Sequence, residues 1–166
     1  MEPTELRQQL DALHRDSFGW ALACCRRDRT EAEDVLQTVY LQVLDGRARF
    51  DGRASFKTWL FAVIRRTAAA ERRRAVLRRL LLERRWIAEG LATSEPAVDG
   101  TERSRGLTDA LRRLAPRQHA VLELVFYHDL TIEQAAIVMG VSLGTARTHY
   151  ERGKRRLAGM LNGDLR

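Results

Sequence analysis

The stretch that decides the fold is TIEQAAIVMGVSLGTARTHYERGKRRL, residues 131–157. Thr131 and Gln134 have the spacing of a capping box, in which two side chains satisfy each other's free backbone amides at a helix start. Gly140 then allows a tight turn, because glycine accepts the left-handed backbone that ends many helices. Ser142 is a typical N-cap for a second, longer helix. Two helices joined by a short glycine turn predict a helix-turn-helix unit.

The second helix of this unit has an apolar stripe and a basic face. The stripe recurs every three or four residues, as a buried helix face does. Arginines stand outside it, and the guanidinium group suits phosphates and base edges. The layout predicts a helix that meets a DNA groove, and the alternative is a three-helix bundle whose basic face is only solvated. The stripe consists of Ala146, Tyr150, Gly153 and Leu157, and the arginines are Arg147, Arg152 and Arg155.

The residues upstream of residue 131 are also helical in pattern. Leu107, Leu111 and Leu114 mark a short helix that stops at Pro116. The sequence RQHAVLELVFY follows at residues 117–127, and its apolar spacing predicts a buried face. That face would contain Val121, Leu122, Val125 and Phe126.

The N-terminal half predicts a separate helical domain. Residues 30–44, TEAEDVLQTVYLQVL, open on a second capping box, Thr30 with Glu33. Ser55 is positioned to cap the next helix, FKTWLFAVIRRT. Residues 6–25 suit an opening helix or helix pair. The stripe within residues 30–44 consists of Val35, Leu36, Val39, Tyr40, Val43 and Leu44.

The expected fold class is all-α, because no alternating strand pattern occurs. We expect two small helical domains, residues 1–85 and 107–166, of which the second holds the helix-turn-helix. Residues 86–106 carry glycines around Pro96 without an apolar period, so they predict a flexible linker. At about 3.3 Å per residue, the 18 residues from Glu89 to Gly106 could extend over about 60 Å and hold two domains well apart.

Charge is concentrated in two blocks. The chain has 166 residues and a net charge of +7. Residues 65–85 hold nine arginines and two acids, residues 141–158 hold five basic residues and one acid, and residues 86–104 are net acidic. Two basic blocks with an acidic stretch between them indicate two sites on one polyanion, and the alternative is a pair of solvated helix faces.

Several classes of protein are not indicated. We find no glycine-rich phosphate loop, no His-x-x-x-His pair and no nucleophile elbow, so we expect neither an enzyme nor a cofactor. Adjacent Cys24 and Cys25 are too few for a structural zinc site, and no metal is expected. No apolar run predicts stable membrane insertion and no signal peptide opens the chain, so a cytoplasmic location is expected. We expect each histidine to cap a helix, to lie on the surface or to contact DNA rather than to bind a metal. The four are His14, His119, His128 and His149.

Three stretches in order resemble one known family. The family is the bacterial RNA polymerase sigma factors of the extracytoplasmic-function (ECF) type, within the sigma-70 family. Its second conserved region resembles AEDVLQTVYLQVL and FDGRASFKTWLFAVIRR. Its fourth conserved region resembles LAPRQHAVLELVFYHDLTIEQAAIVMGVSLGTARTHYERGKRRL. The resemblance implies that the first domain binds core RNA polymerase and melts promoter DNA at the minus-ten element. It implies that the second recognises the minus-thirty-five element, and that an anti-sigma factor is a further partner.

The resemblance assigns three sets of residues. Core polymerase would contact Asp34, Gln37, Thr38, Leu41 and Gln42. Minus-ten binding and melting would use Phe50, Ser55, Phe56, Lys57, Trp59, Arg65, Arg66, Arg72 and Arg73, although core packing is the alternative role for Phe56 and Trp59. Minus-thirty-five binding would use Ser142, Gly144, Thr145, Arg147, Thr148, His149, Glu151, Arg152 and Arg155.

Two other functions compete with this one. A free-standing helix-turn-helix regulator would explain residues 107–166 but leave the first domain without a purpose. An interaction protein would use LRRLLLERRWI, residues 77–87, as an amphipathic segment for a membrane surface or a partner helix. We expect that segment instead to extend a helix that packs on its own domain.

Overall fold

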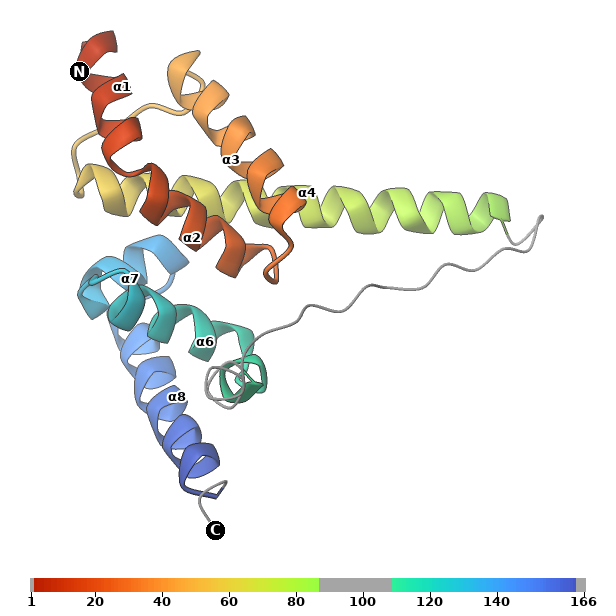
Figure 1. The fold of residues 1–166 in the computed structure, drawn as a ribbon, viewed down its shortest axis with the longest axis vertical. Helices are drawn as coiled ribbons and strands as arrows, with labels where there is room; N and C mark the ends of the chain where they lie inside the picture. Colours follow the sequence, from red (N-terminus) through yellow and green to blue (C-terminus); the bar gives the residue numbers. More distant parts are fainter. Residues whose placement is uncertain (1, 87–108, 164–166) are drawn as a thin grey trace.

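The computed structural model describes residues 2–86 and 109–163, and every regular element in that part of the chain is a helix. The predicted all-α fold is therefore confirmed. A group of helices from the N-terminal part lies against a group from the C-terminal part (Figure 1). Within the described residues, no helix combines the length and the apolar run that crossing a membrane requires.

The N-terminal group contains four helices. Three of them, α2, α3 and α4, pack pairwise around one apolar core. The opening segment forms a helix pair, one of the two arrangements that the sequence left open. The four helices are α1 (Pro3–Ala12), α2 (His14–Cys24), α3 (Arg29–Leu44) and α4 (Phe56–Trp86). Most of the predicted α3 stripe is buried, except that Tyr40 is half-buried and Leu44 is exposed.

Helix α3 begins earlier than the sequence predicted. Its N-cap is Asp28, whose carboxylate accepts a hydrogen bond from the Glu31 amide at 2.9 Å. Thr30 lies inside the helix, and Glu33 pairs with Arg29 at 2.9 Å, so the expected Thr30–Glu33 capping box is wrong. Both side chains can cap a free amide, but only an ionised carboxylate also complements the positive end of the helix dipole.

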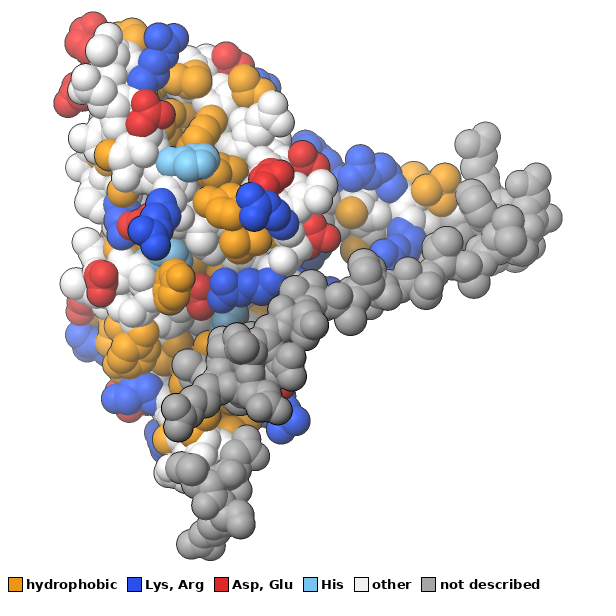
Figure 2. Space-filling model, viewed as in Figure 1, with side chains coloured by type: hydrophobic (Ala, Val, Ile, Leu, Met, Phe, Trp, Pro, Cys, Tyr) orange, Lys and Arg blue, Asp and Glu red, His pale blue; other side chains and the backbone are white. Residues whose placement is uncertain are grey.

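Helix α4 has two halves in different surroundings. Its first half buries Leu60, Phe61 and Ile64 in the core, whereas every residue from Arg72 to Leu82 is exposed. The second half projects beyond the other helices (Figure 1) and carries basic side chains along its length (Figure 2). At about 1.5 Å per residue, the 31-residue α4 is about 46 Å long and α3 only about 24 Å. The expectation that residues 77–87 pack on their own domain is therefore wrong for the described part of that segment.

The C-terminal group contains the predicted helix-turn-helix. Thr131 and Gln134 form the reciprocal capping box, with N–O distances of 3.1 and 2.9 Å. Gly140 adopts φ 65°, and the Ser142 hydroxyl accepts a hydrogen bond from the Thr145 amide at 3.1 Å. The elements are α6 (Pro116–Leu122), η1 (Glu123–Tyr127), α7 (Ile132–Met139) and α8 (Leu143–Gly163).

Element η1 is a π-helix, and it overturns part of the predicted buried face. Phe126 was expected in the core but is 64% exposed, and Glu123 was not expected there but is buried. A π-turn holds more residues than an α-turn, so the face that points inward shifts along the sequence. Leu124 and His128 are buried instead. Of the predicted leucine-marked helix, Leu107 lies outside the described residues.

The two groups share a continuous apolar core. Helix α7 packs against α4, and residues of both groups belong to one buried cluster. Trp20 of α2 stacks on Phe61 of α4 with ring centroids 5.9 Å apart, and His128 meets both rings edge-on, at 5.9 and 5.0 Å. The domains, which the linker could hold well apart, are therefore in contact. The expected linker, except for Trp86 at the end of α4, lies outside the described residues.

Gly153 allows a close approach of α8 to α6. A Cβ atom at this position would lie 3.1 Å from Leu122 Cδ1 and 3.3 Å from Gln118 Cβ, whereas a Cβ at Gly159 would meet nothing within 4 Å. We expect Gly159→Ala to stabilise the protein by about 0.5–1 kcal/mol through helix propensity. With Gly159→Ala as its matched control, Gly153→Ala should have a free energy of unfolding about 1–3 kcal/mol lower, because the added methyl group overpacks the contact. Urea unfolding of the two variants measures this difference, and equal stabilities would contradict the close packing.

Candidate functional site

The outer face of α3 carries the set expected to contact core polymerase. Asp34, Gln37 and Leu41 are exposed, and Thr38 and Gln42 are half-buried. They lie opposite the buried stripe of the same helix, so the structure brings all five together on one surface. A mixed polar and apolar patch of this kind suits contact with another protein.

Three aromatic residues of the minus-ten set form one cluster. The ring centroids of Phe50, Phe56 and Trp59 lie 5.3–5.5 Å apart in pairs. Phe56 is only 9% exposed, and Phe50 and Trp59 are half-buried. Core packing therefore holds Phe56, whereas Phe50 and Trp59 each keep one part at the surface.

Two polar members of the same set are engaged in other contacts. Ser55 caps α4, since its hydroxyl accepts a hydrogen bond from the Thr58 amide at 3.1 Å. Lys57 turns toward α2 and pairs with Asp16 at 2.6 Å, and this contact holds the pKa of the Asp16 carboxyl below its usual value. The structure thus places Ser55 and Lys57 in local contacts of the first domain.

A small basic hollow lies beside the aromatic cluster. Its volume is about 400 Å³, and it is lined on one side by Trp59 and on others by arginines from α4 and from the loop after α3. The hollow joins an aromatic edge to guanidinium groups, the combination that binds single-stranded nucleic acid. The lining arginines are Arg47, Arg49, Arg66 and Arg74. Of these only Arg66 was in the predicted set.

The remaining basic residues of the minus-ten set follow α4. Arg65 is half-buried, and Arg66, Arg72 and Arg73 are exposed. Arg72 donates a hydrogen bond to the Cys24 carbonyl at 2.7 Å, which ties the middle of α4 to the end of α2. For Arg73, the support for a role in DNA binding is its exposed position on the projecting half of α4.

Helix α8 presents the set expected to meet the minus-thirty-five element. Its side toward α6 and α7 buries Ala146 and Gly153, and the other side is open. Arg147 pairs with Glu133 of α7 at 3.3 Å. The exposed members of the set are Ser142, Gly144, Arg147, Thr148, Glu151, Arg152 and Arg155, and the half-buried ones are Thr145 and His149.

A groove of about 1060 Å³ runs between the two domains. Its apolar lining comes from helices of both domains and includes Ala62, Ile137 and Met139. Its basic lining comes from the first domain on one side and from residue 112 on the other. The arginines are Arg26, Arg27, Arg65, Arg66, Arg72 and Arg112.

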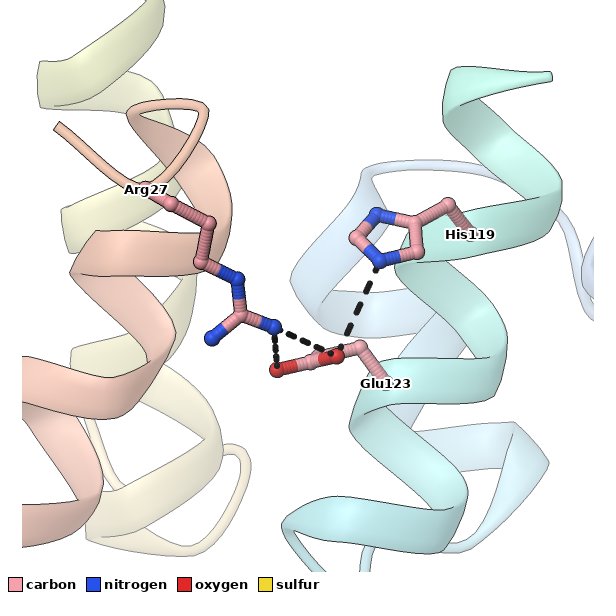
Figure 3. A network of polar contacts seen from close by, with 3 residues as sticks. All are labelled: Arg27, His119 and Glu123. Carbon is pink, nitrogen blue, oxygen red and sulfur yellow. Dashed lines mark hydrogen bonds and ion pairs between the residues drawn. The ribbon is translucent and has the colours of Figure 1, made fainter. Parts of the chain in front are cut away.

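The polar contact across the domains uses residues that the sequence did not single out together. Glu123 of η1 is buried, and Arg27, from the loop after α2, reaches both of its oxygens at 3.1 and 3.3 Å (Figure 3). His119 lies 3.8 Å from the same carboxylate, and burial lowers its pKa. The expected surface or DNA-contacting role for His128 is wrong, since it is 2% exposed. No sequence pattern marks the π-turn that buries Glu123 and His128.

Comparisons with known proteins match this architecture in both domains. Residues 10–79 match sigma-70 region 2, and residues 104–157 match sigma-70 region 4. The RNA polymerase sigma factor CarQ of Myxococcus xanthus is 30% identical over 161 residues, which cover 95% of this chain and 90% of CarQ. The chain belongs to the ECF sigma factors. It therefore acts in promoter-specific transcription initiation with core RNA polymerase, as predicted.

One further relative and two solved structures are also similar to this chain. The ECF sigma factor SigX of Bacillus subtilis is 28% identical over 149 residues, or 86% of this chain and 76% of SigX. The solved structure of the sigma factor RpoE with the anti-sigma factor NepR from Bartonella quintana has a TM-score of 0.73 at 21% identity and covers 95% of this chain and 97% of that one. CnrH, solved with the cytosolic domain of CnrY, has a TM-score of 0.65 at 21% identity, covering 98% and 91%. These two structures share the fold of this ECF sigma factor.

The buried His128 predicts a pH dependence of stability. Burial, with Lys57 nearby, lowers its pKa from 6.5 to about 4, so folding favours the neutral ring. The contribution of the neutral His128 ring to the free energy of unfolding is complete above pH 6.5 and is lost as the pH falls toward 4. His128→Phe keeps an aromatic ring against Trp20 and Phe61 but cannot titrate. We expect the wild type to lose up to about 1.4 kcal/mol per pH unit more than this variant in that window, as measured by urea unfolding. Parallel curves for the two proteins would contradict a buried neutral histidine.

Proposed function

We propose that this ECF sigma factor divides its work between its two domains. Residues 1–85 bind core RNA polymerase through the outer face of α3 and open the minus-ten element, and residues 107–166 read the minus-thirty-five element through α8. Residues 86–106 link them. The observation that carries the proposal is the match of sigma-70 regions 2 and 4 to the two ends of the chain, in that order. A free-standing regulator would not account for the region 2 match.

At the minus-ten element, the hollow beside Trp59 is the place for an unpaired base. Aromatic stacking replaces the base stacking that melting removes, at about 1–3 kcal/mol per base. Arg66 and Arg74 would neutralise neighbouring phosphates. Phe56 and Lys57 support the site rather than bind DNA, because one is buried and the other is paired with Asp16.

At the minus-thirty-five element, the N-terminal turns of α8 would enter the major groove. Arg147 is free to leave Glu133, because an exposed ion pair contributes little to stability. Arg155 lies two turns further along, where a guanidinium meets phosphate rather than base edges. Thus base contacts and phosphate contacts separate along one helix.

An anti-sigma factor is the further partner that we propose. The support is the groove between the domains, which offers an apolar floor and six arginines and therefore suits an acidic amphipathic helix. The sigma factor RpoE, which has the same fold, was solved in complex with the anti-sigma factor NepR. We also propose that the chain works in the cytoplasm and has no enzymatic activity of its own.

Arg147 and Arg155 should respond differently to truncation. Arg147→Ala should cost about 1–3 kcal/mol of promoter affinity and relax base preference at one minus-thirty-five position. Arg155→Ala should weaken binding to all minus-thirty-five sequences alike. Selection from a randomised minus-thirty-five library by the sigma–polymerase complex measures both effects. An unchanged base preference in Arg147→Ala would remove this residue from the reading face.

The α3 face should be required for polymerase binding but not for folding. We expect Asp34→Asn combined with Gln37→Ala and Leu41→Ala to abolish capture by core polymerase and transcription in vitro, because the three side chains share one exposed surface. Thermal stability should change little, since surface substitutions seldom exceed about 0.5 kcal/mol each. The matched control is Glu5→Gln, an exposed acid on α1. Full capture of the triple variant would refute the assignment.

A further inference from the structure

The projecting half of α4 carries apolar side chains that the other described helices leave uncovered. Five large apolar residues lie within positions 76–82, and the exposed fraction of each side chain is between 50% and 58%. Single exposed apolar residues are common on soluble proteins, whereas a contiguous group of them marks a contact surface. The five residues are Val76, Leu77, Leu80, Leu81 and Leu82.

Four of these residues share one face of the helix. Each lies one, three, four or five positions from the others, which places them in a single apolar stripe. Residues 72–82 also contain five arginines, all exposed, and no acidic residue. A helix with an apolar stripe and a basic remainder is of the kind that binds at an interface. The stripe, called here the α4 stripe, consists of Val76, Leu77, Leu80 and Leu81.

The α4 stripe points away from the core of its own domain. Leu80 follows the exposed residues Arg66 and Arg73 at multiples of seven positions, so helix periodicity places it on the same open side. Leu82 follows the buried Ile64 by 18 positions, which is five turns, and therefore continues the side that faces the core. Packing of the first domain around α4 thus cannot cover the stripe, and a partner from outside is required.

The charges around the α4 stripe indicate what that partner is. A second copy of the chain would bring arginines against arginines, and duplex DNA would pair with the arginines but leave the leucines in water. An anionic lipid surface suits both, because acyl chains accept the leucines while headgroup phosphates pair with the guanidinium groups. A cluster of about four to eight basic residues on an amphipathic helix is typical of binding to anionic lipid. The five here are Arg72, Arg73, Arg74, Arg78 and Arg79.

The position of this segment in the molecule also suits a surface. The projecting half of α4 extends beyond the other helices (Figure 1), and basic and hydrophobic side chains lie next to one another along it (Figure 2). Trp59 precedes Leu77 by 18 positions, or five turns, and so adds a half-buried aromatic ring to the same side of α4. Tryptophan is enriched where a membrane meets water.

We propose that the projecting half of α4 binds reversibly to an anionic lipid surface. The helix lies in the plane of the headgroups, with the α4 stripe at the boundary of the acyl chains. The arginines stay at the level of the phosphates, because their long stems let the charged ends reach water. The apolar contact is less than two turns long, so the attachment is peripheral and depends on salt. This binding is additional to the promoter function and does not rest on it.

Flotation of the full chain with lipid vesicles tests the proposal. We expect binding to vesicles of equal parts phosphatidylcholine and phosphatidylglycerol, little binding to phosphatidylcholine alone, and release at high salt. Leu80→Gln should weaken binding to the anionic vesicles about tenfold, because a leucine side chain no longer leaves water. The matched control is Leu82→Gln, the same substitution at nearly equal exposure on the core-facing side of the helix. It should leave vesicle binding almost unchanged.

Two results would overturn the proposal. Absence of binding to the anionic vesicles is the first. Equal weakening in Leu80→Gln and Leu82→Gln is the second, because the arginines alone would then account for the attachment. If the wild type ignores vesicles while Leu80→Gln loses capture by core polymerase, the α4 stripe contacts a protein instead of lipid. Circular dichroism checks that both variants keep the helicity of the wild type, as substitution of exposed side chains should allow.

Discussion

Packing on α4 is the constraint on which the rest of the structure depends. Its first half is the helix against which α2, α3 and α7 all lie, so it is at once the core of the first domain and the platform for the second. Leu60, Phe61 and Ile64 are fully buried in that half. Because buried apolar area is the main favourable term in folding, this helix fixes where every candidate surface of the protein can be.

The platform leaves different surfaces open. The outer face of α3 and the open side of α8 stay exposed while the domains are in contact, so the surfaces that we propose for polymerase and for the minus-thirty-five element are both accessible. The arginines of α4 are divided: those in its middle line the groove, and those beyond Arg72 project into solvent. One helix thereby supplies basic side chains both to the groove between the domains and to the open surface.

Polar chemistry, rather than apolar area alone, gives the domain contact its direction. A bare apolar interface would tolerate several orientations, whereas a buried carboxylate requires its one guanidinium, as Glu123 requires Arg27. The π-turn aims Glu123 and His128 to the same side, toward the first domain. The acidic amphipathic helix proposed for an anti-sigma factor would enter the groove beside this contact, which Arg27 also lines.

The sequence by itself determined the helices and the family. Capping residues and apolar periods are local, so Thr131–Gln134, Gly140 and Ser142 could be assigned correctly, and the three family motifs lie in contiguous stretches. Tertiary structure alone decided the rest. The π-turn at Glu123–Tyr127 moved Phe126 outward, and the packing of α7 on α4 paired Arg27 with a residue 96 positions away. Such contacts join residues whose separation carries no period, and the depth of burial that settles a polar residue's role is a property of the whole fold.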